Sequence, residues 1–169
     1  MLLVDPLIPD AATVEIVNAL ATVEAALLPA SDEYPLDTRW FNGRPVRPSK
    51  VITMTVTAYT PDEISCGASA DGITSSNHSV FTNSMRLVAA DTRILPLGSM
   101  VTVPGYADGS IVPVLDRGGL IKGNRLDVLF SSNTVARKWG VKKLSITVWE
   151  YADGKPAEDW RAIRDSRRQ

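Results

Sequence analysis

The stretch from residue 112 to 130, VPVLDRGGLIKGNRLDVLF, holds two apolar strands that each carry an aspartate. The first strand ends at Asp116, where the chain turns through an Arg-Gly-Gly sequence at 117–119, and the second holds Asp127 between Leu126 and another aliphatic residue. A carboxylate in such a strand must be solvated, paired or protonated, because burial disfavours its charged form. The stretch predicts either a functional site around the two aspartates or, in a purely structural interpretation, a turn-capping Asp116 and an ion-paired Asp127.

The composition is that of a globular protein. The chain has 169 residues, enough for one domain with an appendage, and 44% of them are hydrophobic and 22% charged. A net charge of -1 argues against nucleic-acid binding, which normally needs a basic surface. Because no run of about 18 apolar residues occurs, we expect no membrane span.

The chain has one cysteine, Cys66, and one histidine, His78, and this limits its chemistry. A single cysteine cannot form an intrachain disulfide or a zinc cluster. His78 lies in a polar SSNHS sequence, where we expect a solvated loop histidine rather than a member of a Ser-His-Asp triad. A Cys66–His78 pair is possible by residue type, but Cys66 has no basic neighbour to activate it.

The two ends of the chain have different sequence patterns from its middle. Residues 1–48 predict a helical arm and linker, with a helix over 11–28 that Asp10 caps. A signal peptide is the alternative, but the segment is acidic and has no lysine or arginine before Arg39. We therefore expect an arm that mediates dimer or partner contacts. Residues 153–169 predict a polar tail.

The segment 49–152 has the patterns of a small β domain. A period of two starts at Val51, an Asp108-Gly109 pair indicates a hairpin, and Asn133 and Gly140 flank a short helix. The patterns predict strands over 51–59, 87–90, 100–103, 111–115, 126–130 and 144–149, and a helix over 134–139. About six short strands and one helix suit a closed barrel better than an open sheet.

Several short motifs occur in an order that resembles the 3D domain family, named for three aspartates and related to the catalytic barrel of the MltA-type lytic transglycosylases. The motifs are T-A-Y (57–59), G-I-T (72–74), V-A-A-D (88–91), L-P-L-G (95–98), D-R-G-G-x-I-K-G (116–123) and R-L-D-V (125–128). The resemblance implies a mainly β fold, a six-stranded double-psi β-barrel with a short helix. The N-terminal helical arm would precede this barrel.

The resemblance also implies a reaction and no cofactor. Relatives cleave the β-1,4 bond between N-acetylmuramic acid and N-acetylglucosamine in peptidoglycan without water, leaving a 1,6-anhydromuramoyl end. The three aspartates correspond to Asp91, Asp116 and Asp127 of this chain, and the general acid and base corresponds to Asp127. We expect its pKa to be raised by burial and by the like charges of the other two aspartates.

Further residues are candidates for holding the sugar. Gly118 and Gly119 would let the backbone approach it closely, and Tyr59 and Thr74 are either sugar contacts or packing residues. Relatives often carry a lysine before G-I-T, and this chain has none between Val51 and Ile121. The cations that remain as candidates to bind substrate in its place are Arg86, Arg117 and Lys122. A second departure is Ser75-Ser76-Asn77, where relatives often have a small residue followed by Ser-Gly.

Three other interpretations fit the sequence less well. RlpA-type barrels resemble the chain more weakly, through D-R-G and L-P-x-G, but typically have a histidine at the position of Asp91. A glycan-binding, expansin-like wall module would not need all three aspartates. A calcium site made by them would not match the spacing of a compact calcium loop, so we expect no metal. If the substrate is peptidoglycan, the protein acts in the cell envelope or is secreted.

Overall fold

The computed structural model describes residues 34–62, 71–155 and 158. The chain divides after Thr38 into two units, and all the described strands and helices belong to the second, Arg39–Gln169. The expected helix over 11–28, Cys66 and most of the expected tail lie outside the described residues. The predictions on them stay predictions.

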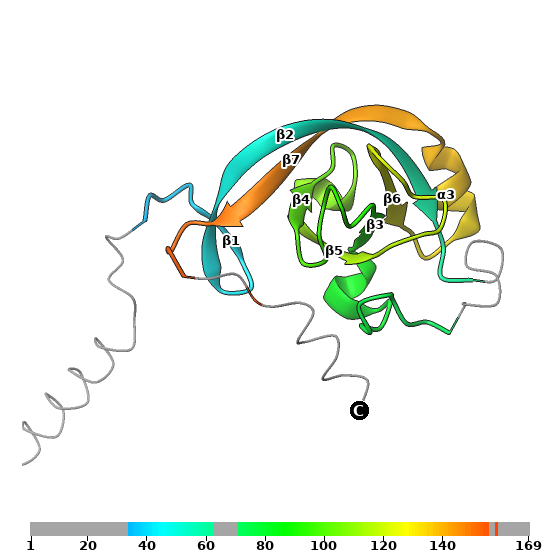
Figure 1. Ribbon diagram of the computed structural model, residues 1–169, viewed down its shortest axis with the longest axis horizontal. Coiled ribbons are helices and arrows are strands. Elements are labelled where there is room, and N and C mark those ends of the chain that lie inside the picture. The colour runs from blue at the N-terminus through cyan, green and yellow to red at the C-terminus, as the bar shows by residue number, and fades with distance from the viewer. Residues whose placement is uncertain (1–33, 63–70, 156–157, 159–169) are drawn as a thin grey trace, which may run out of the picture. The chain divides into compact units, whose positions relative to one another are not determined.

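The described strands form a closed barrel (Figure 1). Six of them pair in the order β2-β6-β3-β5-β4-β7, and the pairing of β7 with β2 closes the ring. β2 pairs in parallel with β6 and β3 with β5, while the other neighbours in the ring are antiparallel. The predicted mainly β fold, a closed six-stranded barrel with one short helix, is confirmed. The elements are β1 (Arg39–Phe41), β2 (Arg44–Tyr59), β3 (Val88–Ala90), β4 (Met100–Thr102), β5 (Val112–Asp116), β6 (Arg125–Leu129), α3 (Asn133–Trp139), β7 (Lys142–Tyr151) and the 3-10 turns η2 (Thr82–Met85) and η3 (Ala107–Gly109).

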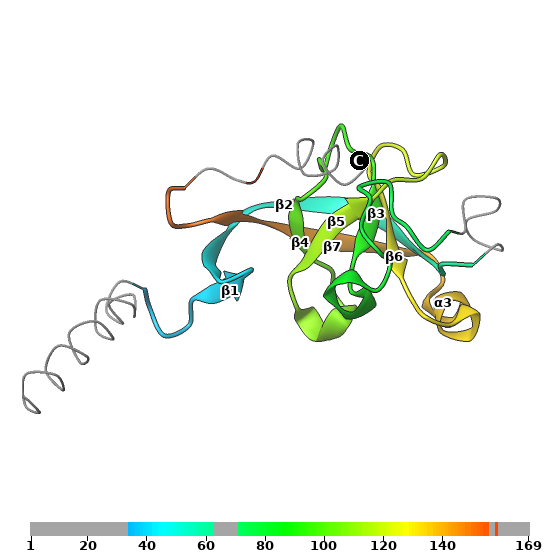
Figure 2. The same ribbon diagram turned by 90° about the horizontal axis from the view of Figure 1, so that it is seen from below.

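Two strands are longer than the sequence pattern predicts. β2 starts at Arg44 instead of Val51 and pairs with β7 as a ribbon that ends beside β1, away from α3 (Figures 1 and 2). Residues 39–41 and 44–48, expected to be linker, are therefore strand, joined by a turn. The register between β2 and β7 shifts between Pro48 and Lys50, as expected where proline cannot donate to the ladder. The prolines concealed this part of the strand.

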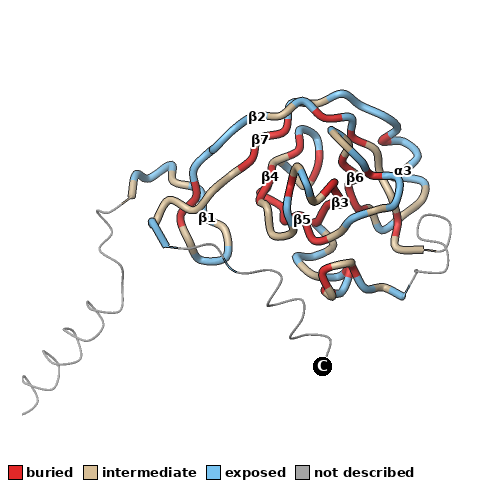
Figure 3. Tube along the Cα trace, in the orientation of Figure 1, coloured by how far each residue is buried: buried red, intermediate tan, exposed pale blue. Residues whose placement is uncertain are grey.

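Alternation along the strands separates the inside of the barrel from its outer face. Met54 and Val56 of β2 and Leu126 and Val128 of β6 are buried in one apolar cluster with residues of every other barrel strand (Figure 3). Trp139 of α3 is buried in this core and makes an edge contact with Tyr106.

A second, smaller cluster lies under the loop that follows residue 71. Val80 of the loop is buried with Leu87, Leu115 and Leu129. The loop is thereby packed against the barrel, and it forms one wall of the site described below.

The helix starts with a different cap from the one expected. Ser132, not Asn133, is the N-cap of α3, and it makes no side-chain cap hydrogen bond. The Asn133 side chain instead bonds Thr60 and Asp62 at the end of β2. Gly140 ends the helix with a positive φ of 67°, as predicted.

Candidate active site

Two of the three aspartates lie in one row of residues across four neighbouring strands. Thr57 of β2 is the register partner of Asp127 on β6, and Asp127 is the partner of Ala89 on β3. Ala89 is in turn the partner of Asp116 on β5. Register partners project to the same face of a sheet, and Thr57, Asp127 and Ala89 alternate with buried core residues such as Leu126, so they face away from the core. The register between β3 and β5 shifts just before Ala89, and across this irregularity Asp116 lines the same pocket as Asp127, although Val114, two residues earlier, is a core residue.

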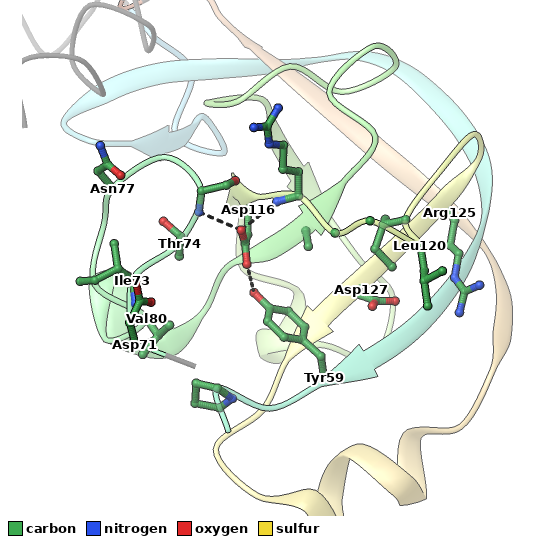
Figure 4. Close-up of a pocket in the computed structure, with 18 residues that line it drawn as sticks. Tyr59, Asp71, Ile73, Thr74, Asn77, Val80, Asp116, Leu120, Arg125 and Asp127 are labelled. Carbon is green, nitrogen blue, oxygen red and sulfur yellow. Dashed lines mark hydrogen bonds between the residues drawn. The ribbon is translucent and has the colours of Figure 1, made fainter. Parts of the chain in front are cut away.

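Two loops convert this row into a pocket of about 550 Å³ (Figure 4). One wall is the loop that contains the G-I-T motif, and the other is the glycine-rich turn after β5. The lining residues are Tyr59, Pro61, Asp71, Gly72, Ile73, Thr74, Ser75, Asn77, Val80, Ala89, Asp116, Arg117, Gly118, Gly119, Leu120, Ile121, Arg125 and Asp127.

Asp127 is the proton-donor candidate of this pocket. Burial raises the pKa of its carboxyl to about 6, and the nearby charge of Arg125 opposes the rise. The direction agrees with the prediction, but the cause is burial alone, since like charge from Asp91 or Asp116 does not contribute. The Thr57 hydroxyl donates a hydrogen bond to Asp127 Oδ1 and holds the carboxyl in place.

Asp116 binds the loops together. Its Oδ1 accepts hydrogen bonds from the backbone N–H of Ser75 at 2.9 Å and of Arg117 at 2.8 Å. Its Oδ2 accepts one from the Tyr59 hydroxyl at 3.3 Å, as the dashed lines in Figure 4 show. One carboxylate thus ties together the end of β2, the G-I-T loop and the turn after β5.

The G-I-T loop has a buried polar network of its own. Ser76 Oγ donates to the Leu115 carbonyl at 2.6 Å and lies 3.0 Å from both Thr74 Oγ1 and His78 Nδ1. His78 is only 6% exposed, so the expectation of a solvated histidine is wrong. Its surroundings in sequence are polar, but those neighbours are its hydrogen-bond partners and not solvent contacts. Thr74 is buried in the same network and also lines the pocket.

Asp91 and Lys122 do not line the pocket. Asp91 is 4% exposed and is held by Arg93, whose Nη2 is 2.6 Å from Oδ2, and by the Gly123 N–H at 2.8 Å. These hydrogen bonds keep the pKa of Asp91 far below its usual range. Asp91 therefore fixes the turn that leads into β6 and Asp127. Lys122, in that turn, is exposed.

The two glycines after β5 differ in their surroundings. A Cβ on Gly118 would come within 2.7 Å of Ile121 Cγ1, whereas one on Gly119 would meet nothing within 4 Å. Gly118 is needed so that the turn can fold back onto Ile121. Both glycines line the pocket, as does Arg117.

Several pocket residues were not predicted. Ala89 separates the two acids, Ser75 Oγ is buried without a hydrogen-bond partner in the described part of the chain, and Ile73 and Leu120 are exposed apolar residues among those lining the pocket. Arg125 also lines it, while Arg86 does not and faces Asp108. The position of Arg125, two residues before Asp127 in a strand, was a usable signal that it lies beside Asp127, because residues two apart in a strand share a face.

Neither a metal cluster nor a membrane helix is found in the residues that the structure describes. No group of three or more His, Cys, Asp or Glu side chains within 34–62, 71–155 and 158 is arranged to hold a metal ion. Over the same residues, no helix is long and apolar enough to cross a membrane.

Comparison with known proteins finds a family that matches part of the barrel. A family model described as the 3D domain matches residues 86–150, which confirms the predicted family for this part of the chain. The cell wall-binding protein YocH of Bacillus subtilis is 38% identical over 101 residues, 59% of this chain and 33% of that protein. The putative cell wall shaping protein YabE of the same organism is 36% identical over 100 residues, 59% of this chain and 23% of that protein. The chain thus spans about a third or less of these relatives.

Solved structures of MltA from Escherichia coli are also similar. One is 21% identical with a TM-score of 0.39 and covers 47% of this chain and 28% of that one. Another, with bound chitohexaose, is 22% identical with a TM-score of 0.37 and the same coverage. These TM-scores are too low for the likeness to bear on function.

Proposed function

Since residues 86–150 carry a 3D domain, we propose that the chain acts on peptidoglycan as a lytic transglycosylase, in the cell envelope or outside the cell. The observation that supports this most is Asp127, a pocket carboxyl whose pKa burial raises to about 6. A carboxyl of that pKa is partly protonated near neutral pH and can donate a proton to a glycosidic oxygen.

The proposed reaction uses Asp127 twice. Its carboxyl proton moves to the oxygen that links N-acetylmuramic acid C1 to the next sugar, and the C1–O bond breaks. The resulting carboxylate then accepts the proton of the muramoyl C6 hydroxyl, whose oxygen forms the new bond to C1. Asp127 ends protonated as it began. The product carries a 1,6-anhydro ring and is lighter by one water than the hydrolysis product.

The other aspartates have different roles in this proposal. Asp116 lines the same pocket from two strands away, roughly 10 Å between Cα atoms at about 4.8 Å for each spacing between strands. Because it already accepts three hydrogen bonds, we assign it to holding the pocket walls and to stabilising positive charge that develops on the sugar. Asp91 is a positioning residue that acts through the turn before β6.

The same hydrogen bonds favour a lyase over a hydrolase. A glycoside hydrolase needs a second carboxylate as nucleophile or base. The pocket does hold a second one, Asp116, but its oxygens are committed to two backbone amides and a tyrosine hydroxyl. A reaction that needs a single acid and base fits Asp127 alone.

Substrate contacts are proposed for the residues that line the pocket. Tyr59, Thr74, Arg117, Gly118 and Gly119 all do so, and we retain them as substrate-binding candidates. Lys122 stays a candidate only for sugars outside the pocket, since it is exposed and not part of the lining.

A second candidate function is glycan binding without cleavage. It is favoured by the relative YocH, named as a cell wall-binding protein, with which this chain shares 38% identity over 101 residues. Such a module would use the pocket but would not need a proton donor. In a binding module of this kind, the raised pKa of Asp127 would have no role.

Digestion of peptidoglycan sacculi separates the two. Purified protein, Asp127→Asn and a control, Asp108→Asn, would be incubated with sacculi and the soluble products separated by mass. We expect anhydro products from the wild type and from the control, whose changed side chain is exposed and does not line the pocket. Asp127→Asn should release none. Binding to sacculi with no product from the wild type would favour the module.

A further inference from the structure

The outer face that carries Asp127 continues past the pocket across β6, β2 and β7. Thr55 of β2 is the register partner of Arg125 on β6 and also of Lys143 on β7. One step further along β2, Thr53 is the partner of Ser145. We call Thr53, Thr55, Thr57, Arg125, Lys143 and Ser145 the polar strip.

Alternation fixes the direction of these side chains. The residues between them, Met54, Val56 and Leu126, are buried in the barrel core, so the strip residues must face outward. Thr53, Thr55, Lys143 and Ser145 are exposed, and Arg125 and Thr57 are half-buried next to Asp127. Figure 4 shows Arg125 at the margin of the pocket beside β2. The strip is thus continuous with the pocket.

The strip offers hydroxyls and two cations. Arg125 Nε is buried and has no hydrogen-bond partner in the described part of the chain, and Arg125 also lines the pocket. A buried guanidinium N–H without a partner is costly, which favours a ligand that supplies an acceptor. Neither Arg125 nor Lys143 forms an ion pair within the described residues, whereas Arg44, Arg47 and Arg93 do.

We propose that the polar strip binds the glycan strand beyond the bond that lies in the pocket, with Arg125 and Lys143 contacting carboxylates carried by that strand. This inference rests on the proposed function for the identity of the polymer. Threonine and serine hydroxyls both donate and accept hydrogen bonds, as sugar hydroxyls do. The strip spans three neighbouring strands, that is two inter-strand spacings of about 4.8 Å or roughly 10 Å in all, and so extends well past the pocket.

Sedimentation with sacculi tests the strip in an Asp127→Asn background, in which the polymer is not consumed. Arg125→Gln and Lys143→Gln remove the two cations. Lys138→Gln on α3 is the matched control, because it removes an equal, exposed charge elsewhere. A parallel set uses sacculi whose carboxylates have been converted to amides. Thermal melts check that each variant folds.

We expect the double variant Arg125→Gln/Lys143→Gln to bind native sacculi about three- to tenfold more weakly than the control, with each single change contributing. The difference should disappear on amidated sacculi and shrink at high salt. Equal binding by Lys143→Gln and Lys138→Gln, or an equal loss on amidated sacculi, would overturn the proposal. Lys143 is exposed, so this outcome can be read even if Arg125→Gln fails to fold.

The experiments can rule out the polar strip and the lytic reaction independently of each other. Anhydro products from the wild type together with binding that ignores both cations would remove the strip and leave the reaction. Cation-dependent binding without anhydro products would remove the reaction and leave a strip that binds a carboxylate-bearing polymer.

Discussion

Asp127 experiences two opposing influences at the residue scale. Burial favours its neutral form, while the cation of Arg125 favours its charged form. Burial dominates and brings the pKa to about 6. The residue can therefore both give and take a proton near neutral pH.

The rate of cleavage should follow this titration. Because the first step needs protonated Asp127, we expect activity to fall as pH rises above about 6. Arg125→Gln removes the charge that lowers the pKa, so the descending limb should move to higher pH. Initial rates of product release across pH would show both effects. A limb near pH 4, or no shift in the variant, would contradict this assignment.

The charged form of Asp127 should also lower the free energy of unfolding. Its pKa rises on folding from 3.8 to about 6, so the folded chain binds more protons between these values. Stability then falls as pH rises through that window, and the cost is complete above it. We expect Asp127→Asn to be more stable than the wild type by about 1–3 kcal/mol at pH 7.5 and about equal to it at pH 3. Denaturant titrations at both pH values measure this difference.

At the scale of elements, the site depends on the turn after β5 and on the G-I-T loop. Asp116 links both to β2, and Val80 packs the loop onto the barrel. Neither segment is regular structure, so their shape comes from these few contacts. The close approach of Gly118 to Ile121 is one of them.

Adjacent glycines provide a matched test of the turn. Gly118→Ala places a methyl group 2.7 Å from Ile121 Cγ1, so the turn must shift, while Gly119→Ala projects into open space. We expect Gly118→Ala to lose about tenfold or more in cleavage and about 1–3 kcal/mol in stability. Gly119→Ala should leave the free energy of unfolding within about 0.5 kcal/mol of the wild type, because its Cβ meets nothing within 4 Å. Equal effects of the two changes would contradict the packing role of Gly118.

Strand patterns in the sequence predicted the elements that build the barrel. Alternation identified the second half of β2 and placed Asp127 between Leu126 and Val128, as the structure has it. It did not identify the first half of β2, where Pro45 and Pro48 lie in a strand interior. Pro45 lies where β2 pairs with the short strand β1, and Pro48 lies at the register shift between β2 and β7.

Pairings between distant residues were beyond reach of the sequence. Asp91 has a local partner in Arg93, two residues away, but the Gly123 N–H that ties it to the turn before β6 comes from 32 residues further along the chain. The burial of His78 likewise depends on Ser76 reaching the Leu115 carbonyl, 39 residues away. The motifs point to candidate residues for the site, and the register determines what each of them contacts.

At the scale of the whole described barrel, the site is created by the closing of the ring of strands. The pairing of β2 with both β6 and β7 places Asp127, the pocket and the polar strip on one continuous outer face. The core beneath is apolar throughout, so this face carries the chemistry. The predicted three-aspartate site thus becomes a pocket with two acids, and the third acid supports it from outside the lining.

Digestion of sacculi in water enriched in heavy oxygen tests the central claim most directly. A reaction closed by the muramoyl C6 hydroxyl takes no oxygen from solvent, so every new end should be an unlabelled anhydro end, lighter by one water than a reducing end. These products should be absent with Asp127→Asn. Labelled reducing ends from the wild type would show that water attacks the sugar, and would contradict the assignment of Asp127 as the single acid and base of a lytic transglycosylase.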